Sequence, residues 1–213
     1  MSARYPLVAI YADESCLGNG KVGDNPGGAG VLVESMHPDG RITRSDLWIS
    51  EPSTTNNRMA LCSVSEAFNA LGTTDDRCSV LFTTDSRYIV DGMTSWVFGW
   101  ARNGWKRKTG AIENLALWQR AIAATDGHEY AWQWVRGHSG HPQNEWANEL
   151  ATRAAAAQTQ SGGLIPSGFD EWLTSMGARS VVRSVVRSVV HSGLAPFPDG
   201  ESFRPSASLP RMG

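Results

Sequence analysis

The chain has 213 residues, of which 41% are hydrophobic and 19% are charged. This composition is typical of a globular protein with one domain of about 150 residues and a smaller appendage. Nineteen Lys and Arg against 21 Asp and Glu give a formal net charge of −2. That balance excludes nucleic-acid binding through bulk positive charge, so any such binding needs a local basic patch.

The sequence lacks the signals of membrane insertion and secretion. No apolar run approaches the roughly 20 residues of a membrane helix, and the stretch Met1–Pro6 lacks the apolar core of a signal peptide. The three cysteines, Cys16, Cys62 and Cys78, have no metal-ligand spacing and are odd in number, which is typical of reduced thiols. We therefore expect a cytoplasmic protein without a membrane partner.

The first third of the chain predicts three strands followed by a helix. Residues Leu7–Ala12 are rich in β-branched and aromatic side chains, Ala29–Glu34 follows a glycine-rich loop, and Arg41–Ile49 alternates in polarity. These three segments predict an antiparallel meander. From Asn56 to Leu71 the apolar residues recur at helical spacing, which predicts the first helix.

Strands and helices then alternate. The segments after the meander are a strand over Ser79–Thr84, helices over Ser86–Phe98 and Asn114–Ala124, a strand over Tyr130–Val135 and an Ala-rich helix over Asn144–Ala157. A meander followed by alternating strands and helices predicts an α/β fold with a mixed five-stranded sheet flanked by helices.

The amino-acid composition of the chain changes near residue 158. We expect one domain over residues 1–157 and, over 158–213, a linker, short helices, an Arg-Ser-Val-Val repeat and a disordered end rich in Pro, Ser and Gly. As a helix, the repeat would carry a Val stripe beside an Arg stripe. Such a helix would pack on the core, bind a partner or a second copy of the chain, or lie along phosphates. The alternative is a low-complexity extension without a specific partner.

Acidic residues follow two neighbouring strands. Asp13 comes directly after the first predicted strand and Asp85 after the fourth. The carboxyl ends of adjacent strands open onto one crevice, where two carboxylates repel each other unless a cation lies between them. Mg²⁺ is a natural partner, and two such ions can clamp the attacking and leaving oxygens of a phosphodiester. The alternative is that each Asp caps the next helix.

Several segments, in order, resemble bacterial ribonuclease H of type 1. The matching segments are Tyr11–Asn19, Thr54–Met59, Thr84–Tyr88, Trp96–Trp105, Leu117–Arg120, Trp132–Pro142 and Asn144–Glu145. The resemblance covers roughly residues 5–157 and implies the ribonuclease H-like fold. It also implies cleavage of the RNA strand of RNA–DNA hybrids by a two-metal hydrolysis, with the hybrid duplex as partner.

The resemblance places four acidic residues at the metals, and this chain keeps only two of them. Asp13 and Asp85 match the first and third, whereas Ala60 and Asn148 stand where the family has Glu and Asp. Asn148 can still offer a neutral oxygen, so we expect Mg²⁺ or Mn²⁺ to bind weakly at Asp13, Asp85 and Asn148. Glu14 is the best candidate for a replacement acid, although strand alternation predicts that its side chain points to the opposite face from Asp13, unless the strand has already ended.

Three explanations fit these two replacements: engineered changes, a natural pseudonuclease, or a weak natural nuclease with a relocated acid. The first hypothesis is therefore an endonuclease of ribonuclease H type, with its activity weakened or lost through Ala60 and Asn148. The alternative is a catalytically inactive protein of the same fold that binds a hybrid or another partner.

The resemblance also assigns residues to hybrid binding. It places Asn19, Asn56 and Asn57 at the minor groove, where 2′-hydroxyls distinguish RNA from DNA, and Thr55 at a phosphate of the DNA strand. The alternative for residues 54–56 is a helix N-cap. Arg87 stands where many relatives have Gln, so it could contact a phosphate.

A basic patch and a histidine complete the implied site. Trp100, Arg102 and Lys106 match the family's helical handle, which holds the DNA strand; the alternative is a solvated basic loop. His138 lies in a Gly-His loop after the last strand, where a neutral imidazole near the metals could shuttle protons and help the product leave. Without the resemblance, a histidine in such a loop is often inert.

Overall fold

The computed structural model describes residues 3–18, 25–37, 39–72, 77–107, 109–181 and 194–210. The strands are β1 (Leu7–Cys16), β2 (Gly27–Met36), β3 (Ile42–Glu51), β4 (Ser79–Thr84), β5 (Glu129–Trp134) and β6 (Ile165–Pro166). The helices are α1 (Asn56–Ala70), α2 (Arg87–Asp91), the π-helical turn η1 (Gly92–Trp96), α3 (Val97–Arg102), α4 (Leu115–Ala124), α5 (Pro142–Ala157) and α6 (Phe169–Val181).

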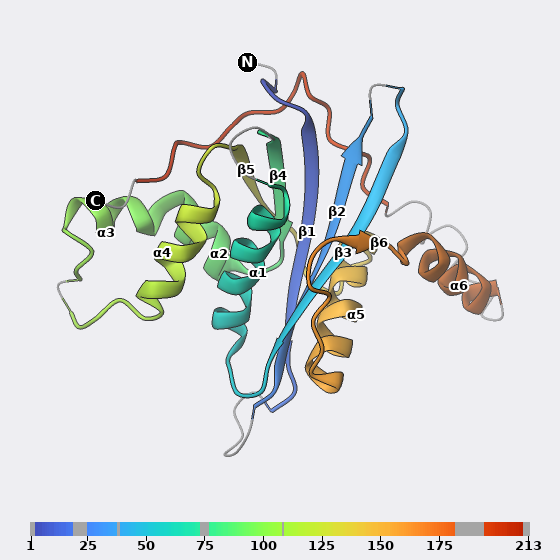
Figure 1. Ribbon diagram of the computed structural model, residues 1–213, viewed down its shortest axis with the longest axis horizontal. Coiled ribbons are helices and arrows are strands. Elements are labelled where there is room, and N and C mark those ends of the chain that lie inside the picture. Colours follow the sequence, from blue (N-terminus) through green and yellow to red (C-terminus); the bar gives the residue numbers. More distant parts are fainter. Residues whose placement is uncertain are drawn as a thin grey trace.

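The strands form one mixed sheet in the order β5-β4-β1-β2-β3-β6. The meander β1-β2-β3 is antiparallel, while β4 runs parallel to β1 and β5 runs parallel to β4. The predicted α/β class with a mixed sheet is therefore confirmed (Figure 1). The short strand β6 is an addition to the five predicted strands, and it pairs antiparallel with the outer edge of β3.

Helices cover both faces of this sheet. On one face, α1 and α4 pack over a core that includes Ile10, Leu61, Phe82 and Trp118. On the other face, α5 lies against the meander, as seen beside β2 and β3 in Figure 1. The approach is close because β2 has glycine at position 30, where a Cβ atom would stand 2.2 Å from the Ala147 carbonyl oxygen. The first turn of α5 is thereby held against β1, beside the strand ends that carry the predicted acids.

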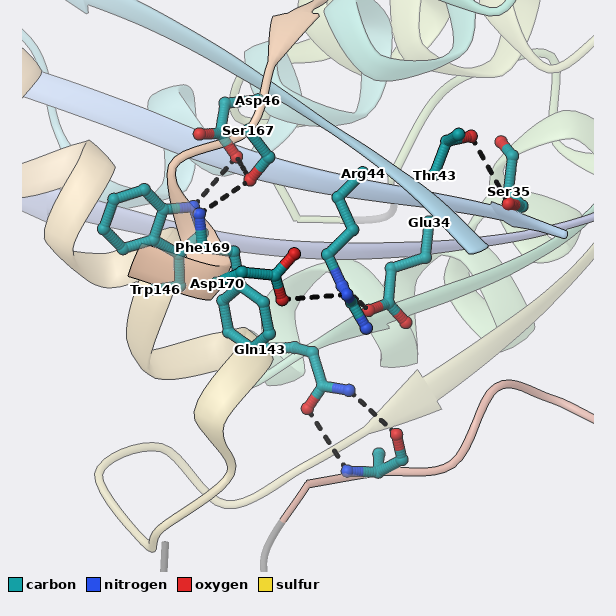
Figure 2. Close-up of polar contacts among 11 residues, drawn as sticks. Glu34, Ser35, Thr43, Arg44, Asp46, Gln143, Trp146, Ser167, Phe169 and Asp170 are labelled. Carbon is teal, nitrogen blue, oxygen red and sulfur yellow. Dashed lines mark hydrogen bonds and ion pairs between the residues drawn. The ribbon is translucent and has the colours of Figure 1, made fainter. Parts of the chain in front are cut away.

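The extension is attached to the sheet through buried polar groups of β2 and β3 (Figure 2). The Arg44 guanidinium donates to the buried carboxylate of Glu34 at 2.7 Å and to Asp170 of α6 at 2.9 Å. The Asp46 carboxylate, also buried, accepts from Trp146 Nε1 of α5. The Gly168 backbone N–H, two residues after β6, also donates to Asp46 and helps to hold this short strand beside β3.

Residues 194–210, where composition predicts disorder, also contact the folded core. Gln143 of α5 exchanges two hydrogen bonds with the backbone of Ala195, and the backbone N–H of Leu209 donates to the Tyr130 hydroxyl at 2.6 Å. Phe203 and Leu209 are buried. The division at residue 157 stays a prediction, and residues 182–190 of the Arg-Ser-Val-Val repeat lie outside the described residues.

None of the helices in the described ranges is both long enough and apolar enough to span a bilayer.

Candidate active site

The two predicted strand-end acids lie at the same edge of the sheet. The last register pair between β1 and β4 is Ala12 with Thr84, so Asp13 and Asp85 both follow that pair directly. With Glu14 they form a cluster in which one ligand oxygen from each carboxylate lies within 4.8 Å of the other two. This spacing is compatible with three carboxylates sharing a cation.

The expectation that Glu14 points away from this cluster is wrong. Side chains alternate along β1 as along any strand, but β4 ends at Thr84 whereas β1 continues to Cys16, so no neighbouring strand blocks this side of β1 at Glu14. The Glu14 side chain therefore has room to turn past the end of β4, where it hydrogen-bonds to the Ser86 side chain. A third carboxylate thus lies beside Asp13 and Asp85.

Burial and mutual repulsion make these carboxylates reluctant to ionise. The pKa of Asp13 is raised to about 8, mainly by burial and then by the charge of Asp85. Burial, followed by the charges of Asp13 and Asp85, raises the pKa of Glu14 well above its usual range. Burial also raises the pKa of Asp85. Such a cluster is stabilised in its charged form by a hard divalent cation, and an all-oxygen donor set suits Mg²⁺ or Mn²⁺.

The orientation of Asp13 is fixed by two neighbours. One carboxylate oxygen accepts from the backbone N–H of Glu14 at 2.7 Å, and the other accepts from the Asn144 amide at 3.4 Å. Asn144 is buried in the first turn of α5. The sequence places Asn144 in a segment that resembles the family without indicating a role; in the structure its amide contacts the Asp13 carboxylate.

At the other two positions where the family has acidic residues, this chain has side chains that differ in whether they can supply a metal ligand. Ala60 is buried in the core on α1 and supplies no ligand atom. Asn148 is partly buried and lies one helical turn after Asn144, on the same face of α5. Its role as a metal ligand stays a prediction.

His138 lies close to the cluster on an exposed loop. The charge of His138 lowers the pKa of Asp85, whereas the negative charge of Glu145 raises it. His138 Nδ1 lies 3.9 Å from a carboxylate oxygen of Glu145. The geometry leaves this imidazole open to solvent at the rim of the cluster.

Two of the three residues assigned to the minor groove, Asn56 and Asn57, lie at the start of α1. Thr55 caps this helix, with its hydroxyl accepting from the Arg58 backbone N–H at 3.4 Å. The Asn56 side-chain oxygen is buried and has no hydrogen-bond partner in the part of the chain that the structure describes. Asn57 is partly buried beside it. Asn19 lies outside the described residues.

The handle residues share an open groove. Trp100, Arg102 and Lys106 line a hollow of about 720 Å³ around α3 and the loop that follows it. Trp100 packs edge-to-face on Trp118, with ring centroids 5.5 Å apart. The structure thus brings these three predicted residues together, although no contact shows what they bind.

Gly137 lies directly against the Asp85 carboxylate of the acidic cluster. A Cβ atom at this position would stand 2.0 Å from a carboxylate oxygen of Asp85. We expect Gly137→Ala to rotate that carboxylate out of the cluster and to lower kcat for hybrid cleavage by roughly 100-fold, while the thermal unfolding temperature changes little. Steady-state cleavage kinetics and a melting curve check this.

The matched control is Gly200→Ala in the extension, since a Cβ atom at Gly200 meets only the Ala3 Cβ atom, at an ordinary contact distance of 3.8 Å. It should leave the hydrolysis rate close to that of the wild type. Full activity in Gly137→Ala would show that the position of the Asp85 carboxylate is not critical.

Comparisons with known proteins agree with this geometry. The family profile described as RNase H matches residues 6–156. The chain is 42% identical to the ribonuclease H of Ruegeria pomeroyi over 147 residues, covering 68% of this chain and 90% of that protein. It is 44% identical to that of Alcanivorax borkumensis, covering 68% and 89%.

A solved structure extends the similarity beyond residue 157. LC9-RNase H1, described as a type 1 RNase H with the type 2 active-site motif, is 62% identical, with a TM-score of 0.85. The match covers 97% of this chain and 94% of that one, so it includes most of the extension. On the fold, the profile and these identities together, the chain belongs to the bacterial type 1 ribonuclease H family.

Proposed function

We propose that this protein is a metal-dependent endonuclease that hydrolyses the RNA strand of RNA–DNA hybrids. The observation that carries the proposal is the cluster of Asp13, Glu14 and Asp85, in which Glu14 supplies the carboxylate that Ala60 lacks. The proposal favours a natural nuclease with a relocated acid. It is supported by LC9-RNase H1, a 62% identical protein whose active-site motif is likewise described as departing from type 1.

In this proposal Asp13, Glu14 and Asp85 hold the metal, and Asn148 adds a neutral oxygen. Bound there, a divalent cation supplies an activated water and neutralises charge that develops on the phosphate. The backbone N–H of Glu14 and the Asn144 amide orient Asp13. His138, exposed at the rim of the cluster with Nδ1 3.9 Å from a Glu145 carboxylate oxygen, would carry a proton from solvent to the leaving oxygen.

Hybrid recognition is assigned to two surfaces. At the start of α1, the unpartnered Asn56 oxygen is an acceptor suited to a 2′-hydroxyl, which DNA lacks. Asn57 and Thr55 lie beside it, and the backbone N–H groups at this helix end favour anions. In the handle groove, Arg102 and Lys106 provide positive charge for phosphates of the DNA strand, with Trp100 next to them.

The alternative is an inactive hybrid-binding protein of the same fold. The observation that favours it is Ala60, a buried methyl group at a position where the family has a metal ligand. The two functions differ only in cleavage, since the binding surfaces are the same.

The test is cleavage of a labelled RNA–DNA hybrid with Mg²⁺ or Mn²⁺, with duplex DNA and single-stranded RNA as competing substrates. We expect the wild type to cut only the hybrid, and Asp13→Asn to be inactive. The double variant Ala60→Glu/Asn148→Asp separates the alternatives. Activity confined to that variant indicates a silenced site, and activity retained by Asp13→Asn would overturn the metal assignment.

The raised pKa of Asp13 predicts how stability depends on pH without a divalent metal. The folded protein keeps this proton up to about pH 8, whereas the unfolded chain releases it near the usual value of 3.8. Between these values the folded state binds more protons, so its free energy of unfolding falls as the pH rises toward 8. Thermal melts with a chelator, at about pH 5 and about pH 8, should show this decline.

Added Mg²⁺ should oppose the decline, since metal binding needs the deprotonated carboxylates. Asp13→Asn removes one of the three carboxyl groups with a raised pKa, so it should make the decline shallower while Glu14 and Asp85 still titrate. A variant that declines as steeply as the wild type would show that another group is responsible.

A further inference from the structure

Trp134 contacts both a residue of the candidate metal centre and Arg87, whose positive charge has no role in the proposed function. It is the last residue of β5, and its indole N–H donates to the backbone carbonyl of Asp85 at 2.9 Å. Trp134 is 38% exposed. The Arg87 guanidinium lies over its ring, with the central carbon 4.0 Å from the ring centroid. A single side chain thus contacts both a metal-binding residue and an exposed arginine.

Arg87 has no anionic partner in the described part of the chain. It is exposed at the first position of α2, two residues after Asp85, and forms none of the ion pairs among the described residues. The charged side chains that set the pKa of Asp85 are instead His138 and Glu145. The Arg87 charge therefore remains available for a ligand.

Stacking determines which part of the guanidinium is available. The guanidinium lies over the ring and forms no ion pair among the described residues, so its N–H donors that point away from the ring remain free for an anion with several acceptor oxygens. Phosphate has this chemistry, and Arg binds it with two parallel hydrogen bonds. Because the ring already restricts the guanidinium, less side-chain freedom is lost when the ligand arrives.

We propose that Arg87, stacked on Trp134, binds a phosphate of the RNA strand adjacent to the one that is cut. Trp134 is a positioning residue, which holds Arg87 through its ring and the Asp85 backbone through its N–H. This inference rests on the proposed function, since it assumes that a nucleic-acid strand crosses the metal centre. It extends that function by coupling substrate binding to the placement of a metal ligand.

The first test measures hybrid binding in an Asp13→Asn background, so that no cleavage occurs. Adding Arg87→Gln should raise Kd about 5-fold or more and should reduce the slope of log Kd against log salt concentration by roughly 0.9, the value for one phosphate contact. Trp134→Leu should raise Kd similarly. The two together should cost no more than either alone, because both remove one contact.

The matched control is Arg4→Gln. Arg4 is another exposed arginine over an aromatic ring, 5.4 Å from the Tyr5 centroid, and its backbone N–H donates to Glu129, a bond that the substitution keeps. Its loss should leave the salt slope unchanged. An unchanged slope in Arg87→Gln, or additive effects in the double variant, would overturn the proposal.

The second test separates the two contacts of Trp134 in the active protein. Trp134→Phe keeps a ring beneath Arg87 but loses the N–H, so kcat should fall while the salt slope of binding is retained. Arg87→Gln should raise KM by a larger factor than it lowers kcat. If Trp134→Phe has the same kcat as the wild type, Trp134 has no positioning role.

These outcomes are distinct from a failure of the proposed function. If the wild type does not cut hybrids, the proposed function itself is wrong. If it cuts hybrids and Arg87→Gln keeps the wild-type salt slope, only the phosphate contact is wrong. Melting curves of both variants check that the fold is retained.

Discussion

Replacing Glu14 with Gln is expected to lower kcat/KM for hybrid cleavage by at least about 10³-fold, or about 4 kcal/mol of transition-state stabilisation. Glu14 provides one of three carboxylates within 4.8 Å of one another, and Ala60 offers no substitute. The Gln side chain keeps the size and loses the charge, so a loss reports on metal binding rather than packing. Cleavage kinetics and a Mg²⁺ titration measure the effect.

A swap of the acid provides the control. Glu14→Gly/Ala60→Glu removes the acid at position 14 and restores at position 60 the Glu that the family resemblance implies, and it should recover part of the activity that Glu14→Gly alone loses. Because Ala60 is only 1% exposed, the melting temperature of the swap must be measured as well. Near wild-type activity in Glu14→Gln would show that Glu14 is not a ligand, and would leave the cluster with two acids.

The sequence predicted the strands and helices of the core because their periodicity is local. The meander, the alternating second half and the helix α5 all follow from side-chain spacing within each segment. The strand β6 could not be predicted in this way, since it has two residues and pairs with β3 beside an anchored turn. Its position depends on Asp46 and Arg44, which lie more than a hundred residues earlier in the chain.

The candidate site was predictable to the extent that it depends on strand ends. Asp13 and Asp85 each follow a strand, and parallel pairing of β1 with β4 brings them together. The orientation of Glu14 depends instead on where β4 stops relative to β1, and one sequence does not fix that offset. The contact from Asn144 depends on the packing of α5 against the glycines of β2, which is a tertiary property.

A second large effect concerns stability. Asp46 is 3% exposed, and its carboxylate accepts from Trp146 Nε1 at 2.8 Å, the Ser167 hydroxyl at 2.6 Å and the Gly168 backbone N–H at 2.9 Å. Asp46→Ala leaves three donors without this acceptor, at a cost of about 1–3 kcal/mol for each one that stays buried. We expect the free energy of unfolding to fall by about 3 kcal/mol or more, as measured by urea denaturation.

The matched control is Asp39→Asn on the loop between β2 and β3, where the Asp39 side chain is 65% exposed and pairs only with Arg41. It should change stability by no more than about 0.5 kcal/mol.

Asp46 joins three segments, namely β3, the helix α5 that carries Asn144, and the start of the extension. Its loss should therefore lower the stability of the domain and the extension in one transition. A variant that loses less than about 1 kcal/mol, or that releases the extension while the domain unfolds as before, would show that the extension is attached to the domain without stabilising it.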